Sequence, residues 1–257
     1  MEYQTIKGER VPSLGLGTYR LTGKTCAQAV ETALSMGYRH IDTAQMYGNE
    51  AEVGRGISAS GVDREDLFIT TKIWTSDFAH DRVLGSTRES LRKLGTDHID
   101  LLLMHWPPRN STPLGETLGA MRELQDDGAV RHIGVSNFST SLVEAAAEHA
   151  EIFCNQVEYH PFRSQPEILE QAREMDYLLT AYRPLYRGGV EDDATLEEIG
   201  EAHGKTAAQI ALRWLIQQEK VSAIPKATSE DHLHSNLDVF DFELSAEEME
   251  RISGLSR

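Results

Sequence analysis

HIDLLLMH (residues 98–105) and VRHIGVS (residues 130–136) are two apolar runs, and the stretch between them at residues 113–127 has helical periodicity. An apolar run, a helix and a second apolar run are typical of a βα unit on a parallel sheet. The same alternation extends in both directions, and no linker, low-complexity tract or clear repeat divides the chain. We therefore predict one domain over residues 1–257.

Eight such runs occur in order, each followed by a helical stretch. A parallel sheet of eight strands with a helix after every strand closes most simply as a TIM barrel, so we predict an α/β fold of the (β/α)8 type. The open, doubly wound alternative usually has a glycine-rich first turn, but GLGTYR (residues 15–20) lacks the third glycine. The predicted strands are 14–17, 38–42, 66–72, 98–105, 130–136, 152–158, 177–182 and 221–225.

Turn and cap signals set the remaining elements. QTIKGERVPSLG (residues 4–15) is typical of an N-terminal β-hairpin that turns near Gly8 and Glu9. The first helix should begin at about Thr25, with a threonine N-cap and Gly37 past its end. Further helices are expected at 49–60, 89–95, 113–127, 142–150, 168–175, 195–204, 207–218, 231–237 and 246–254.

The composition excludes several classes of protein. With 41 acidic and 25 basic residues among 257, the formal charge is −16, which disfavours nucleic acid and anionic membranes as partners. No window approaches the roughly 20 apolar residues of a membrane helix, and MEYQTIKGER lacks the apolar core of a secretion signal. Two cysteines, Cys26 and Cys154, cannot form a disulfide framework. We expect a cytoplasmic monomer.

The basic residues are unevenly divided, with 7 lysines and 18 arginines beside the 41 carboxylates. This composition is compatible with a protein kept soluble at high salt and equally with an ordinary acidic enzyme. The melting temperature measured against KCl concentration distinguishes the two, because only a salt-adapted protein should gain stability up to molar salt.

Polar side chains stand at the carboxyl ends of the predicted strands, which share one face of a (β/α)8 barrel and carry its function. Asp42, Ser136 and Asn137 are also typical helix N-caps. Asp42 and Lys72 alone would make an ordinary buried ion pair, and His105 alone an ordinary core residue. An Asp, a Lys and a His on three successive strands together favour a site. The whole set is Asp42, Lys72, His105, Ser136, Asn137, Gln156, Glu158, Tyr182 and Lys226.

Six motifs in this order resemble the aldo-keto reductase superfamily, and bacterial 2,5-diketo-gluconate and methylglyoxal reductases in particular. The likeness runs from GLGTYR to the last helix, and it implies a (β/α)8 barrel that reduces carbonyl compounds with a nicotinamide cofactor. The motifs are HIDTAQMYGNEAEVG (40–54), TTKIW (70–74), MHWP (104–107), GVSNF (134–138), CNQVEYHP (154–161) and IPKATSEDHLHSN (224–236).

The resemblance implies a catalytic tetrad of Asp42, Tyr47, Lys72 and His105. A tyrosine hydroxyl is a reluctant acid, with a reference pKa of about 10, and an adjacent ammonium eases release of its proton. Asp42 would keep Lys72 charged and in place. His105 would orient the carbonyl oxygen of the substrate by a hydrogen bond. Taken alone, Tyr47 would be an aromatic residue of a loop.

The resemblance also implies where the nicotinamide binds. Ser136, Asn137 and Gln156 would hydrogen-bond its carboxamide, and the ring of Tyr182 would stack on it.

The pyrophosphate would lie along Arg183, Pro184 and Leu185 and along the segment after Lys226. The family usually has a serine where this chain has Arg183. A guanidinium can bind phosphate through two hydrogen bonds, or it can stay solvated and leave the pyrophosphate to the backbone.

Recognition of the 2′-phosphate of NADPH is implied for Lys226, with Asn236 further along the same cofactor segment. The family's usual serine is replaced by Ala227 and its usual arginine by His232. Both changes weaken phosphate binding, so we expect NADPH to be used and NADH to be accepted as a second cofactor. His232 and His234 are two residues apart on a predicted helix and point apart, so no metal site is expected.

Tyr19, Trp74 and Trp106 follow strand ends and should line the substrate site with His105, unless they only cap the barrel core. A short connection after residue 182 and the end of the chain at Arg257 suggest an open site for small aldehydes, α-keto aldehydes or keto sugars. One alternative is a cofactor-binding regulatory or structural barrel without turnover. Another, a phosphosugar isomerase, would need a glycine-rich phosphate loop, of which AYRPLYRGG (181–189) and AIPKATS (223–229) are poor versions.

Overall fold

The computed structural model of the chain describes residues 1–108 and 112–256. Eight strands, all parallel, form one sheet in the order β10-β9-β8-β7-β6-β5-β4-β3. The two edges of the sheet meet, because Leu14 pairs with Ala223 in parallel and the amide of Gly15 donates to the carbonyl of Ala223 at 2.9 Å. The predicted (β/α)8 barrel is confirmed. Its strands are β3 (Leu16–Gly17), β4 (His40–Asp42), β5 (Phe68–Ile73), β6 (Ile99–Met104), β7 (Val130–Ser136), β8 (Ile152–Glu158), β9 (Leu178–Tyr182) and β10 (Val221–Ala223).

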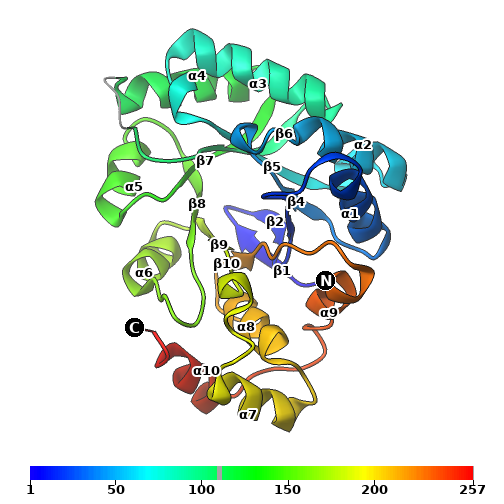
Figure 1. The fold of residues 1–257 in the computed structure, drawn as a ribbon. Helices are drawn as coiled ribbons and strands as arrows, with labels where there is room; N and C mark the ends of the chain where they lie inside the picture. Colours follow the sequence, from blue (N-terminus) through cyan, green and yellow to red (C-terminus); the bar gives the residue numbers. More distant parts are fainter. Residues whose placement is uncertain (109–111, 257) are drawn as a thin grey trace.

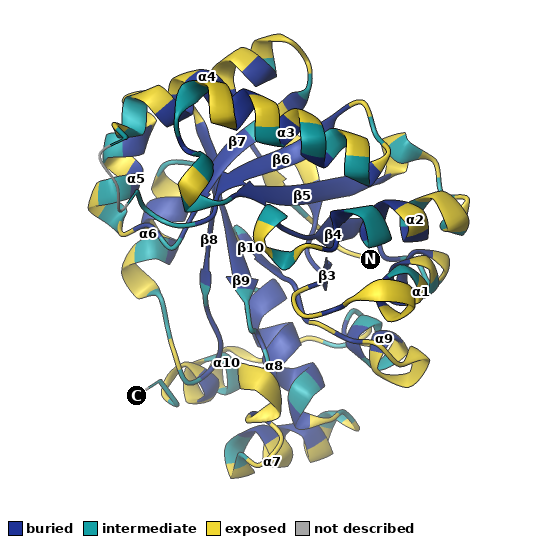
Figure 2. Ribbon diagram, turned by 45° about the horizontal axis from the view of Figure 1, so that its top comes forward, coloured by how far each residue is buried: buried dark blue, intermediate teal, exposed yellow. Residues whose placement is uncertain are grey.

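Helices surround the ring of strands, as Figure 1 shows. Figure 2 shows that the strands are buried while the helices expose their outer faces. No described helix combines the length and the apolar character needed to cross a membrane. The α-helices are α1 (Gly23–Ser35), α2 (Glu50–Ser60), α3 (His80–Leu94), α4 (Leu114–Asp126), α5 (Thr140–Ala147), α6 (Pro166–Glu174), α7 (Ala194–His203), α8 (Ala207–Ile216), α9 (Glu230–Leu237) and α10 (Ala246–Ser253). The 3₁₀ turns are η1 (Gln45–Tyr47), η2 (Arg64–Asp66), η3 (Thr75–Asp77) and η4 (Tyr186–Gly188).

Many predicted boundaries differ from the observed ones by two or three residues, and three differences have a local explanation. Helix α1 follows Thr22 rather than starting at Thr25, because the backbone of Thr22 is extended and the helix begins immediately after it. Helix α3 begins nine residues before the predicted stretch, since its buried face already starts at Val83 and Leu84. The hairpin turns at Lys7 and Gly8, one residue early, with positive φ angles of 49° and 86° at the two turn residues. Arg257, where we expected the chain to leave the site open, lies outside the described residues.

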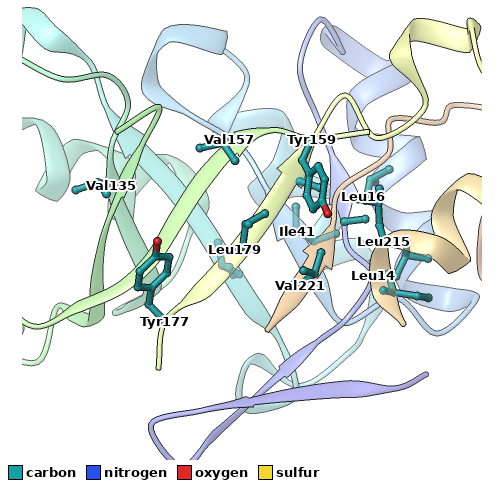
Figure 3. Close-up of a cluster of buried hydrophobic side chains, with 14 of the residues drawn as sticks. Leu14, Leu16, Ile41, Val135, Val157, Tyr159, Tyr177, Leu179, Leu215 and Val221 are labelled. Carbon is teal, nitrogen blue, oxygen red and sulfur yellow. The ribbon is translucent and has the colours of Figure 1, made fainter. Parts of the chain in front are cut away.

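Two apolar layers hold the barrel. The larger one lies between the strands and the surrounding helices, where Leu179 and Val221 from the sheet share a core with Leu215 of α8, as Figure 3 shows. The smaller one fills the inside of the barrel, and Ile6 and Val11 of the hairpin take part in it. This hairpin, made of β1 (Tyr3–Ile6) and β2 (Glu9–Pro12), lies across the middle of the ring (Figure 1). It therefore closes the end of the barrel at which the strands begin.

Candidate active site

Alternation along the strands places the polar residues at the open end of the barrel. Successive side chains of a strand point to opposite faces, so residues two apart share a face. On β6, Leu101 and Leu103 pack inside the barrel, and two residues further on His105 stands at its mouth. On β5, Phe68 lies inside and Lys72 follows four residues later in the same orientation. The interior thus changes from apolar to polar along β5 and β6.

Asp42, Lys72 and Tyr47 meet at this mouth. The ammonium nitrogen of Lys72 lies 2.6 Å from Oδ1 of Asp42, 2.8 Å from the carbonyl oxygen of Thr43 and 3.3 Å from the hydroxyl of Tyr47. The side chain of Lys72 is 0% exposed and that of Asp42 is 2% exposed. An ammonium has three hydrogens and no acceptor site. Three acceptors therefore match its three donors, and the hydroxyl of Tyr47 accepts one of them.

Burial and mutual attraction both shift the pKa values of Lys72 and Asp42. Burial works to lower the pKa of Lys72, but the charge of Asp42 and the hydrogen bonds to Asp42 and Tyr47 oppose it, and the pKa is raised overall. Burial raises the pKa of Asp42, against the opposing charge of Lys72 and the hydrogen bonds that Lys72 and Gln156 donate. Because all three hydrogens of the ammonium have acceptors, the lysine is held in its charged form.

Tyr47 and His105 are both neutral at neutral pH. Burial raises the pKa of Tyr47, and Lys72 lowers it in part. Burial, followed by the charge of Lys72, lowers the pKa of His105 to about 3. The two rings lie 5.7 Å apart, edge to face. A protonated phenol and an uncharged imidazole therefore face the same space above the ammonium.

Aromatic side chains flank this pair. The ring of Tyr19 lies 5.0 Å from that of Tyr47, and the ring of Trp74 lies 5.2 Å from that of His105. Tyr19 is exposed, while Trp74 and Trp106 are half-buried. Tyr19 and Trp74 thus touch the tetrad directly, and Trp106 follows His105 in the chain.

A second polar group lies beside the tetrad at the ends of β7, β8 and β9. The hydroxyl of Tyr182 donates to Oδ1 of Asn137 at 2.8 Å. The amide nitrogen of Asn137 donates to Oγ of Ser136 at 3.0 Å and to the carbonyl of His105 at 3.1 Å. Gln156 completes the group, because its carbonyl accepts the hydroxyl of Ser136 at 2.8 Å and its side-chain amide donates to Oδ2 of Asp42 at 2.7 Å. The predicted nicotinamide residues and the tetrad are therefore one connected network.

Arg183 has a protein partner that the sequence did not reveal. Its guanidinium lies 3.2 Å from Oε1 of Glu158, whose other oxygen is 3.2 Å from Arg163. Pro184 is buried, and Leu185 is half-buried against the core. A cavity of about 530 Å³ adjoins this ion pair. Its lining residues are Glu158, His160, Phe162, Arg163, Tyr186, Gly189, Asp192 and Asp193.

The last predicted cofactor segment follows β10. Lys226 is exposed, Ala227 is buried, and Ser229 caps helix α9 through the backbone amide of His232. His232 is exposed and Asn236 is buried on that helix. Throughout residues 1–108 and 112–256, no group of three or more His, Cys, Asp or Glu side chains is placed to hold a metal ion.

Comparison with known proteins explains this arrangement. The family model described as Aldo/keto reductase family matches residues 13–257. The chain belongs to this family. The resemblance drawn from the six motifs is therefore confirmed.

Several relatives of this aldo/keto reductase have named activities. Glyoxal reductase of Bacillus subtilis (strain 168) is 41% identical over 97% of this chain and 91% of its own length. Methylglyoxal reductase DkgB of Escherichia coli O157:H7 is 40% identical over 95% of this chain and 93% of its own length. A solved structure provisionally named 2,5-diketo-D-gluconic acid reductase B is 48% identical, with a TM-score of 0.97 over 100% of this chain and 92% of that one.

Two residues that position the aldo/keto reductase site were missed in the sequence. The side-chain amide of Asn49 donates to the carbonyls of Thr18 and Leu21 and accepts the hydroxyl of Thr43, so it ties the loop after β4 to the loop after β3. Gln45 accepts the backbone amide of Trp74 at 3.1 Å. Gln45 and Asn49 both lie in the motif at residues 40–54, close to Asp42 and Tyr47. This position was the feature of the sequence that could have identified them.

Proposed function

We propose that this aldo/keto reductase reduces aldehydes and small ketones, including α-keto aldehydes and keto sugars, to alcohols with NADPH. The observation that carries the proposal is the hydrogen bond from Lys72 to Tyr47. Because the phenol oxygen accepts from the ammonium, the hydrogen of the phenol is left for another acceptor. A carbonyl oxygen above Tyr47 and His105 is such an acceptor.

The chemistry of the residues at the mouth fits a nicotinamide. Ser136 and Asn137 offer hydroxyl and amide groups to a carboxamide, and Tyr182 offers a half-buried ring that the bond to Asn137 holds in place. The bound cofactor would supply the hydride to the carbonyl carbon. An exposed cation at Lys226 suits a phosphate, and Ala227 and His232 leave it without the usual hydroxyl and guanidinium neighbours.

Each residue of the tetrad would then have a separate role at or near the carbonyl oxygen. His105, neutral because of its lowered pKa, would donate a hydrogen bond that orients this oxygen. Tyr47 would transfer its proton to the oxygen as negative charge develops there. Lys72 stabilises the phenolate left behind, and Asp42 keeps the ammonium charged and in place.

Oxidation of NADPH in the presence of methylglyoxal or 4-nitrobenzaldehyde tests the proposal. Turnover of either aldehyde is the expected result. Tight binding of NADPH with no turnover of any aldehyde would instead identify the regulatory or structural barrel considered from the sequence.

Cofactor preference is tested by the same assay with both cofactors. We expect the kcat/KM for NADPH to exceed that for NADH by less than about a thousandfold, because a thousandfold would need about 4 kcal/mol of discrimination. Lys226 alone would have to provide that discrimination here. A larger ratio would contradict the assignment of Ala227 and His232 as weakening substitutions.

A further inference from the structure

The hydrogen bond between Gln156 and Asp42 crosses the barrel. Strand β8 is four strands away from β4 in the sheet order, so in a closed ring of eight the two strands face each other. Nε2 of Gln156 nevertheless lies 2.7 Å from Oδ2 of Asp42, and the two residues are 2% and 1% exposed. Two side chains that are 114 residues apart in the chain therefore meet below the mouth.

The backbone of Gln156 is fixed on both sides. It pairs with Ser136 on β7 and with Thr180 on β9, and its carbonyl accepts the backbone amide of Asn137 at 2.9 Å. The side chain is buried as well, with 2% of the residue exposed, and packing around it limits the positions that its amide can take. Backbone pairing and burial together hold the donor on the side of the barrel opposite Asp42.

The carboxylate of Asp42 divides its two oxygens between two partners. Oδ1 faces the ammonium of Lys72, and Oδ2 accepts from Gln156. An ionised carboxylate in a dry interior depends on such donors, because each unmet acceptor costs free energy. The other ionisable groups around it belong to the same interior: His40 on β4, Tyr47 on η1, His105 after β6 and Cys154 on β8.

We propose that Gln156 is a positioning residue for Asp42, which it holds from across the barrel in the orientation that pairs with Lys72. This role is additional to the carboxamide contact expected from the sequence, and its effect on the reaction rests on the proposed function. The cross-barrel bond keeps Asp42 ionised and turned toward the lysine. The lysine in turn keeps its third hydrogen on Tyr47.

The substitution Gln156→Leu removes the donor and nearly preserves the volume. Loss of one hydrogen bond to the ionised form should raise the pH at which Asp42 titrates by about one unit. The measurement is the carboxyl ¹³C NMR titration of the cofactor-free protein, in which the signal of Asp42 is the one missing from Asp42→Asn. An unshifted titration of Asp42 would overturn the proposal, even if the enzyme reduces no carbonyl compound.

Kinetics supply the second readout. In Gln156→Leu we expect kcat to fall about tenfold, with its acid limb moved upward by about one pH unit. In the Asp42→Asn background the same substitution should have little further effect on kcat, because the two changes act through one interaction. Equal losses in both backgrounds would show that Gln156 acts on the cofactor alone.

Thr180→Val is the matched control. Thr180 is also buried inside the barrel, where its hydroxyl lies 2.9 Å from that of Ser222, and no hydrogen bond of the described chain joins it to Asp42. This variant also loses a buried hydrogen bond. It should lower the melting temperature without moving the Asp42 titration or the pH profile, whereas a general loosening of the interior would move both.

Discussion

Each end of the barrel has a buried aspartate paired with a positively charged side chain, and the two pairs differ in exposure and in what they contact. At the mouth, Lys72 and Asp42 are almost completely buried, and the third hydrogen of the ammonium goes to the phenol of Tyr47. At the other end, Asp100 is 2% exposed, but its partners Arg64 and Arg131 are 20% and 40% exposed. Water therefore reaches only the second pair.

The partners of Asp100 show what that pair does. The guanidinium of Arg64 donates to the carboxylate at 2.6 Å and to the carbonyls of Leu67 and His98. The same carboxylate accepts the backbone amide of Ile69 at 2.8 Å. All of these contacts join one loop or strand start to another. The pair at the closed end thus fastens the backbone, whereas the pair at the mouth donates to the hydroxyl of Tyr47, the proton donor of the proposed reaction.

The largest expected effect comes from the mouth. Tyr47→Phe should lower kcat at least a hundredfold, because general acid catalysis contributes about 10²–10⁴. The substitution also leaves one hydrogen of the buried Lys72 ammonium without its acceptor, which should cost about 1–3 kcal/mol, so the melting temperature should fall by about 2–10 °C while the fold persists. Steady-state kinetics and thermal unfolding measure the two effects.

Tyr159→Phe is the matched control for that substitution. It removes a hydroxyl that donates to Gln218 at 2.7 Å, on a ring that packs against Trp214 of α8 in the outer apolar layer, and it should cost stability of about 1 kcal/mol with activity retained. If Tyr47→Phe kept most of its activity, the assignment of the proton donor would be wrong.

At the closed end the expected effect is on stability. Asp100→Asn should lower the free energy of unfolding by about 2 kcal/mol, because it removes the charged partner that Arg64 contacts at 2.6 Å and leaves Arg131 with Glu65 alone. Solvent around both arginines keeps the loss below that of a fully buried pair. Urea unfolding measures it, and kcat of the folded variant should be unchanged. A loss of activity without a loss of stability would show that the Asp100 pair serves the reaction and not the fold.

Acid should weaken the barrel through two of its buried histidines, His40 and His105. Burial lowers the pKa of His40 and of His105 to about 3 in the folded chain, while an unfolded histidine titrates near 6.5. Between these values the unfolded state binds more protons, so stability falls as the pH falls, by about 1.4 kcal/mol per pH unit for each histidine. Urea unfolding at about pH 7 and about pH 5.5 should show a smaller decrease in His40→Asn. An equal decrease in both proteins would exclude His40 as a source.

The smallest expected effect is a difference in how the two ion pairs respond to salt. The destabilisation by Asp100→Asn should shrink by a few tenths of a kcal/mol in molar KCl, because ions screen partly exposed pairs. The pH profile set by Asp42 and Lys72 should not move, since that pair is out of reach of solvent. A shift in this profile would show that the mouth is as open to ions as the closed end.

The strand ends were predictable because alternation along a strand is a local property. Asp42, Lys72 and His105 were predicted because each stands at the end of an apolar run, and alternation explains why His105 shares the inner face with Leu101 and Leu103. The tetrad itself needed the likeness to a family, since Tyr47 lies on the 3₁₀ turn η1 after the strand. Nothing in its spacing alone distinguishes it from other aromatic loop residues.

Partner choice was not predictable, because it depends on which strands face each other after closure. Gln156 was expected to meet a cofactor, and the structure also gives it Asp42 on the opposite strand. Arg183 was expected to meet phosphate or solvent, and it lies on Glu158. The start of α3 was missed for a simpler reason, since only the second half of its amphipathic stretch was counted.

The hairpin that lies across the barrel gives the molecule the shape of a cup. Among the described residues, Ile6 and Val11 share one apolar cluster with Phe68, Leu101 and Leu103, so side chains fill this end of the barrel. If a cofactor and a substrate both bind at the mouth, as proposed, they approach it from the same side. We then expect the deeper of the two to enter first and to leave last, an order imposed by a hairpin on the far side of the barrel.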